Sequence, residues 1–93
     1  MTELLSDEEI ATRLAAGEWK REGESIVRDW KFADFAQAMA FVNRVAEAAE
    51  EANHHPDILV HGWNKVRLLL TNHSAGGLTE ADFTVAARFD QLA

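Results

Sequence analysis

The stretch Asn53-His54-His55-Pro56-Asp57 is the point at which the pattern of the chain changes from helix to strand. An alanine-rich pattern of helical period precedes it and ends near Ala52. Pro56 cannot continue this helix, because proline lacks an amide donor and its ring clashes with the preceding turn. Pro56 also biases His55 towards extended backbone geometry, in which successive side chains point in opposite directions. The stretch therefore predicts a helix end that carries two histidines with different jobs.

The residues after this stretch predict a β-hairpin that returns a third histidine to the pair. Two β-type runs, residues 57–63 and 65–72, have similar lengths, so an antiparallel hairpin would bring His73 back beside them. Glu50 lies one helical turn before His54. An imidazole of ordinary pKa, about 6.5, both gives and takes protons near neutral pH. Converging groups of this kind indicate a site for general acid-base catalysis.

The remaining sequence predicts one α+β domain that spans residues 1–93. The expected elements are a helix that starts with a Ser6-x-x-Glu9 capping box and ends at Gly17, strands in 18–22 and 25–32, a long helix capped by Asp34, the hairpin above, and a last helix capped by Thr79. Arg28 interrupts the apolar alternation of the second strand. The order α-β-β-α-β-β-α predicts a four-stranded antiparallel sheet with three helices packed on one face. The pattern leaves the order of strands in the sheet open.

The composition of the chain bears on its partners, its cysteine chemistry and its location. Nine basic against sixteen acidic residues give a net charge of -7, which opposes non-specific binding to phosphate backbones, so we expect no direct nucleic-acid partner. The chain has no cysteine, hence no disulfide and no thiol nucleophile. No basic leader or apolar run of about 18 residues is present, so we expect no membrane partner and a cytoplasmic location.

The long helix carries an apolar stripe that predicts core packing and, at one edge, a subunit contact. The stripe consists of Phe35, Ala38, Met39, Val42, Val45, Ala46 and Ala49. Phe41 lies beside it and widens the apolar face beyond what a small sheet covers. Leu69 likewise points away from the predicted core face of its strand. A chain of 93 residues has a limited core, so we expect a homodimer or homotetramer with Phe41 in the contact.

The motifs around the histidines closely resemble the signature of the pterin-4a-carbinolamine dehydratases. In chain order they are Trp19, Phe32-x-x-Phe35, Phe41-x-x-Arg44-Val45-Ala46, Glu50-x-x-x-His54-His55-Pro56-Asp57, Trp63-Asn64-Lys65-Val66, Thr71-Asn72-His73 and Gly77-Leu78-Thr79-x-x-Asp82. Together they cover nearly the whole chain. Three features depart from the family pattern: Asn53 stands where many members have aspartate, Ile58 stands where many have an aromatic residue, and the turn at 22–24 is shorter than in the animal proteins.

The resemblance implies an activity and a role for individual residues. The family dehydrates 4a-hydroxytetrahydropterin, the carbinolamine left after aromatic amino-acid hydroxylation, to the quinonoid dihydropterin, and uses no cofactor or metal. By resemblance, His54 and His73 transfer protons, His55 holds the pterin, and Glu50 and Asp82 orient the histidines. The residues expected to contact substrate are Trp19, Asn53, His54, His55, Thr71, Asn72, His73 and Asp82. A core position is the alternative for Trp19, and which proton-transferring histidine is the acid stays open.

A zinc site, a hydrolase and a non-enzymatic module are the alternatives to histidine acid-base catalysis. A catalytic zinc needs three protein ligands and an open position, but His54 and His55 diverge on extended backbone and suit one ion poorly. Serine or cysteine hydrolysis has no support, because there is no cysteine and no glycine-flanked serine elbow. His61 lies outside the motifs and is expected to have no catalytic role. A non-enzymatic interaction module is the alternative function, since some animal relatives act as dimerisation cofactors of a homeodomain transcription factor.

Overall fold

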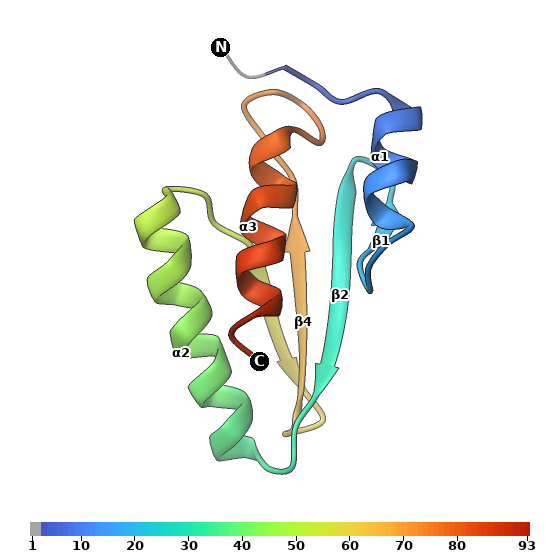
Figure 1. Ribbon diagram of the computed structural model, residues 1–93. Helices are drawn as coiled ribbons and strands as arrows, with labels where there is room; N and C mark the ends of the chain where they lie inside the picture. The colour runs from blue at the N-terminus through green and yellow to red at the C-terminus, as the bar shows by residue number, and fades with distance from the viewer. Residues whose placement is uncertain (1–2) are drawn as a thin grey trace.

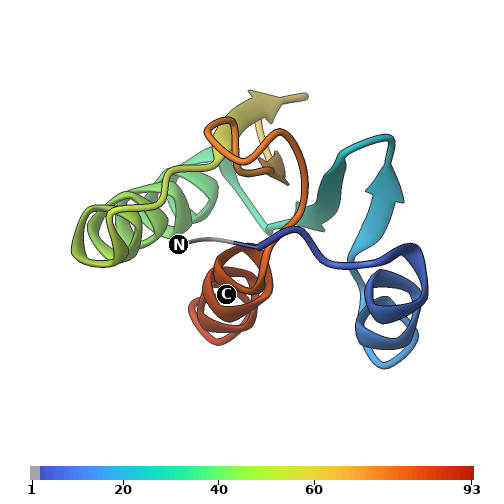
Figure 2. The ribbon, with the colours of Figure 1, turned by 90° about the horizontal axis from the view of Figure 1, so that it is seen from above.

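The computed structural model describes residues 3–93 and has the predicted order of elements (Figure 1). These are α1 (Asp7–Leu14), β1 (Lys20–Glu22), β2 (Ser25–Lys31), α2 (Phe35–Ala52), β3 (Asp57–His61), β4 (Lys65–Leu70) and α3 (Glu80–Asp90). All neighbouring strands are antiparallel, and their order in the sheet is β1-β2-β4-β3. The three helices lie on one face of the sheet (Figure 2). The predicted fold class is confirmed. None of the helices within residues 3–93 could cross a lipid bilayer, given their length and polarity.

The helix-facing side of the sheet is the predicted one. Leu68 and Val66 of β4 lie opposite Ile58 and Val60 of β3, which confirms the predicted antiparallel hairpin. The fully buried residues of this face are Ile26, Val66, Leu68 and Leu70. The β4 part of this face is apolar because side chains on a strand alternate between its two sides, and every second residue from Val66 to Leu70 is aliphatic.

Arg28 lies on the same helix-facing side, between Ile26 and Trp30, and a carboxylate in α3 explains how it is tolerated. Its Nη1 atom donates to Asp90 Oδ1 at 2.7 Å, and its guanidinium carbon lies 4.6 Å from the ring centroid of Trp30. Burying an arginine is costly unless the charge is paired. Arg28 therefore joins the sheet to the last turn of α3 rather than shifting the strand register.

The predicted role of Phe41 at a subunit contact is wrong. Phe41 is fully buried, and its ring centroid lies 4.8 Å from that of Trp30 and 5.1 Å from that of Phe32. The helix turns the face containing Phe41 and Val45 towards the sheet, while Phe35, expected in the core stripe, is 54% exposed. The aromatic side chains of β2 and of the loop after it form a cluster that Phe41 completes.

Three predicted ends differ from the structure, and one of them is the end of β4, which is Leu70 rather than residue 72. The Ser6–Glu9 capping box is present, but α1 ends at Leu14, and Gly17 does not adopt the left-handed geometry expected of it. Its amide donates to the Leu14 carbonyl at 3.2 Å, so a right-handed turn closes the helix. The first arm of the hairpin also ends earlier, at His61, because Gly62 and Trp63 both have positive φ and form the turn.

Candidate active site

The end of α2 fixes the backbone position of His54. Asn53 has left-handed geometry, with φ 51° and ψ 41°, and its amide donates to the Glu50 carbonyl at 3.2 Å. The amide of His54 reaches back to the Ala49 carbonyl at 3.1 Å. This pair of hydrogen bonds is a Schellman motif, in which asparagine is one of the few residues that tolerate the left-handed position. Asn53 therefore acts through the backbone, and its own side chain is exposed.

His54 is held by a buried carboxylate from the first turn of α3. Its Nε2 atom lies 2.6 Å from Asp82 Oδ1, and the side chains are 15% and 0% exposed respectively. Asp82 Oδ2 accepts the Thr79 amide at 2.8 Å and the Thr79 hydroxyl at 3.3 Å. A carboxylate can only accept, so the proton of the His54–Asp82 bond belongs to Nε2. In the neutral form of the ring, Nδ1 is then the lone-pair nitrogen, and the carboxylate holds the ring in one orientation.

His55 has a different and more exposed partner. Its Nε2 atom contacts Glu50 Oε2, and these side chains are 56% and 76% exposed. Water screens such a pair, so it holds its histidine more loosely than a buried pair does. The predicted difference between the two histidines is thus matched by a difference in their carboxylate partners.

The loop after β4 carries His73 on a frame made by Asn72. The Asn72 amide donates to the Gly77 carbonyl at 3.0 Å, and its own carbonyl accepts the Gly76 and Gly77 amides at 2.9 and 3.2 Å. Its side-chain Oδ1 accepts the Ala75 amide at 3.0 Å. These bonds close residues 72–77 into a small loop with His73 exposed on it. Asn72, expected to bind substrate, thereby positions the loop.

The hairpin register brings the His54–His55 segment and the His73 loop to one end of the sheet. Asp57, the first residue of β3, lies opposite Leu69, one residue before the end of β4. The segments that precede β3 and follow β4 therefore leave the sheet together. No hydrogen bond within residues 3–93 joins His73 to His54 or His55.

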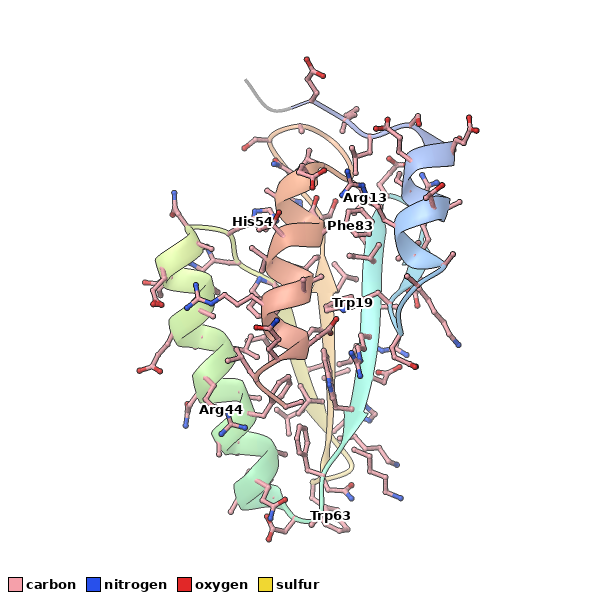
Figure 3. The ribbon with its side chains drawn as sticks, in the orientation of Figure 1. Arg13, Trp19, Arg44, His54, Trp63 and Phe83 are labelled. Atoms are coloured by element: carbon pink, nitrogen blue, oxygen red, sulfur yellow. The ribbon has the colours of Figure 1, made fainter. Side chains whose placement is uncertain are left out.

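Trp19 and Thr71, two other expected substrate contacts, have structural partners. Trp19 is buried, and its Nε1 atom donates to Asp90 Oδ1 at 2.8 Å. Asp90 is eight residues beyond Asp82 in the same helix, a rise of about 12 Å. The Thr71 hydroxyl donates to the Glu24 carbonyl at 2.6 Å and ties the loop after β4 to the β1–β2 turn. Figure 3 shows Trp19 beside the middle of β2, His54 near the start of α3, and Trp63 at the far end of the molecule.

Thr79 is a functional residue that the sequence did not reveal as one. Thr79 was expected only as a helix cap, yet it is the second donor to the carboxylate that holds His54. The Thr79-x-x-Asp82 spacing, typical of a capping box, was the available signal.

Among residues 3–93, no three His, Asp or Glu side chains converge in a way that would hold a metal ion.

Comparison with known proteins identifies the family. Residues 3–92 match the family model described as pterin 4 alpha carbinolamine dehydratase. The chain belongs to the pterin 4 alpha carbinolamine dehydratase family. A relative from Thermomicrobium roseum, to which this activity is assigned only provisionally by name, is 56% identical over 81% of this chain and 80% of its own.

Two solved structures of the family resemble the fold. A protein from Brucella melitensis described as a transcriptional coactivator/pterin dehydratase has a TM-score of 0.91 and 33% identity, over 98% of this chain and 99% of its own. A pterin dehydratase-like protein identified as a RuBisCO assembly factor in the alpha-carboxysome has a TM-score of 0.70 and 31% identity, over 83% of this chain and 90% of its own. The same dehydratase fold is thus described in proteins with more than one role.

Proposed function

We propose that the protein is a 4a-hydroxytetrahydrobiopterin dehydratase that works by histidine acid-base catalysis. The observation that carries the proposal is the His54–Asp82 pair, in which a buried carboxylate fixes one tautomer of a histidine at the end of the sheet where the His73 loop also lies. A catalytic histidine needs such an orienting partner on the nitrogen that does not react. The family assignment supplies the substrate class.

The proposed reaction needs two proton transfers. Hydroxide is a poor leaving group, so the C4a oxygen takes up a proton as the C–O bond breaks, and a ring nitrogen loses one as the quinonoid product forms. General acid-base help of this kind contributes about 10²–10⁴-fold in rate. His54, through Nδ1, and His73 share these transfers. His55 binds the pterin, while Asp82 and Glu50 orient His54 and His55 respectively.

The test is a turnover assay on enzymically generated 4a-hydroxypterin, with wild type, His54→Ala and His61→Ala. His61 is the matched control, because it is exposed at the end of β3, at the opposite end of that strand from His54. We expect turnover in wild type and His61→Ala and a large loss in His54→Ala. A wild type that does not accelerate dehydration, or a His61→Ala variant as impaired as His54→Ala, would refute the proposal.

A second candidate function is a non-enzymatic interaction module. It is favoured by the solved relatives described as a transcriptional coactivator/pterin dehydratase and as a RuBisCO assembly factor. A stoichiometric complex with a partner protein, together with no pterin turnover, would select this function over the dehydratase.

We also propose that the protein forms a homodimer or homotetramer. The small core and the exposed apolar side chains Phe35, Leu59 and Trp63 support an oligomer, although Phe41 takes no part in it. Light scattering across a concentration series measures the assembly, and a monomer throughout would exclude it.

A further inference from the structure

The first described residues of the chain pair with the segment that leads into α3. Leu4 forms an isolated antiparallel bridge with Thr79, and the Leu5 amide donates to the Leu78 carbonyl at 2.9 Å. Leu4 and Leu5 are called the N-terminal strap below. Figure 2 shows the strap crossing the segment between β4 and α3 just before α3 begins. The Ser6–Glu9 capping box follows the strap immediately and anchors it to α1.

The segment beneath the strap is the one that holds the Asp82 carboxylate, which orients His54. Leu78 and Thr79 are 1% and 0% exposed. The Thr79 amide donates to Asp82 Oδ2 at 2.8 Å, and Asp82 Oδ1 lies 2.6 Å from His54 Nε2. A continuous series of contacts therefore runs from the strap through Thr79 and Asp82 to His54.

Gly77 allows the strap to approach this segment closely. A Cβ atom at Gly77 would lie 3.2 Å from Leu4 Cδ2 and 2.6 Å from Glu24 Oε2. The strap and the β1–β2 turn thus both pack against Gly77. Thr71 is tied to the carbonyl of Glu24, so the turn holds the start of the loop while the strap holds its end.

We propose that the N-terminal strap is a positioning element of the active site. By pairing with Leu78 and Thr79, it fixes the amide that orients Asp82, and through Asp82 it fixes the tautomer and direction of His54. Displacement of a catalytic group by about 1 Å can lower a rate on the order of 10²-fold. Loss of the strap contact would let Thr79, Asp82 and His54 shift, and turnover would fall for that reason. The inference rests on the proposed function for its kinetic consequence.

The test compares Leu5→Pro with Leu5→Ala. Alanine removes more of the leucine side chain than proline, whose ring retains three carbons, but only proline removes the amide that donates to Leu78. Proline also favours extended geometry at Leu4, the geometry that a β-bridge requires, so the strap is not redirected. Two measurements are made on each folded protein: kcat and KM for 4a-hydroxypterin, and the NMR signal of the His54 Nε2 proton.

We expect Leu5→Ala to retain the wild-type kcat and imidazole signal. Leu5→Pro should lower kcat by about 10- to 100-fold with a smaller change in KM, and solvent exchange should broaden the Nε2 proton signal. If Leu5→Pro lowers the melting temperature but leaves kcat and the imidazole signal as in Leu5→Ala, the strap is only structural and the proposal is wrong.

Two provisions keep the result decisive. If Leu5→Pro does not fold, a chain lacking residues 2–5 but retaining the Ser6–Glu9 capping box takes its place, with the same expected losses. If wild type has no pterin turnover, the proposed function fails. The imidazole signal then decides by itself whether the strap controls His54.

Discussion

Replacing Asp82 by asparagine tests the active site with the smallest change in shape. Asparagine is nearly isosteric with aspartate, but it presents an NH₂ group in place of one carboxylate oxygen. Its remaining oxygen can still accept the Thr79 amide that lies 2.8 Å from Oδ2. The NH₂ group then faces His54 Nε2, which must accept, so the imidazole proton moves to Nδ1. The variant keeps its helix cap and reverses the tautomer of the histidine.

The expected loss of kcat can be estimated from the known size of two effects, a wrong histidine tautomer and the loss of a general acid or base. In serine protease triads, an aspartate-to-asparagine change that forces the wrong histidine tautomer lowers kcat about 10⁴-fold. One general acid or base contributes about 10²–10⁴-fold. We therefore expect Asp82→Asn to lower kcat by about 10²–10⁴-fold, equivalent to about 3–5 kcal/mol in the activation free energy.

Glu50→Gln is the matched control, because it makes the same chemical change beside His55. That pair is 76% and 56% exposed, and exposed ion pairs contribute at most about 1 kcal/mol. Its effect on kcat/KM should stay below about fivefold, given that limit. Steady-state turnover and ¹⁵N chemical shifts of the His54 ring measure the rate and the tautomer. Equal small losses in both variants, or a wild-type tautomer in Asp82→Asn, would refute the role of Asp82.

The other predictions concern the remaining histidines, the core, metal dependence and one surface ion pair. His73→Ala should lower kcat with little change in KM, whereas His55→Ala should mainly raise KM; equal effects on the two constants would contradict these roles. Phe41→Ala should lower the free energy of unfolding by about 3–5 kcal/mol in urea titrations, because its ring is fully buried; a loss typical of a surface site would place the ring elsewhere. Prolonged chelation should leave turnover unchanged and elemental analysis should find no stoichiometric zinc, whereas activity lost to chelation and restored by zinc would favour a metal site. The Arg67 guanidinium holds the pKa of Asp29 below its usual range, so the pair stabilises the fold above the unfolded pKa of about 3.9 and this stabilisation is lost as the pH falls through the lower folded pKa. Urea titrations of Asp29→Asn should therefore differ from wild type by less than about 1 kcal/mol at pH 7 and converge in acid, and a difference that grows in acid would have the wrong sign.

Local signals in the sequence were enough to predict the elements and their order. The Ser6–Glu9 capping box, Asp34 as a helix cap and Pro56 after a helix end each act within about one turn of the chain. The alternation of aliphatic residues in β4 likewise reports which side of the strand is buried, because successive side chains point to opposite faces. The motif spacings were also enough to indicate the family, which the comparisons confirm.

Contacts between residues far apart in the chain were decided only by the tertiary structure. The spacing placed Glu50 one helical turn before His54. In the structure the chain turns at Asn53, which has left-handed geometry, and Glu50 contacts His55 instead. His54 instead pairs with Asp82, 28 positions away, because the first turn of α3 lies beside the segment that follows α2. The rotation of α2 about its axis, which buries Phe41, was likewise decided by contacts with residues far away in the chain. A helical period defines an apolar face only to within a residue or so, and the aromatic cluster that α2 covers settles which side chains are enclosed.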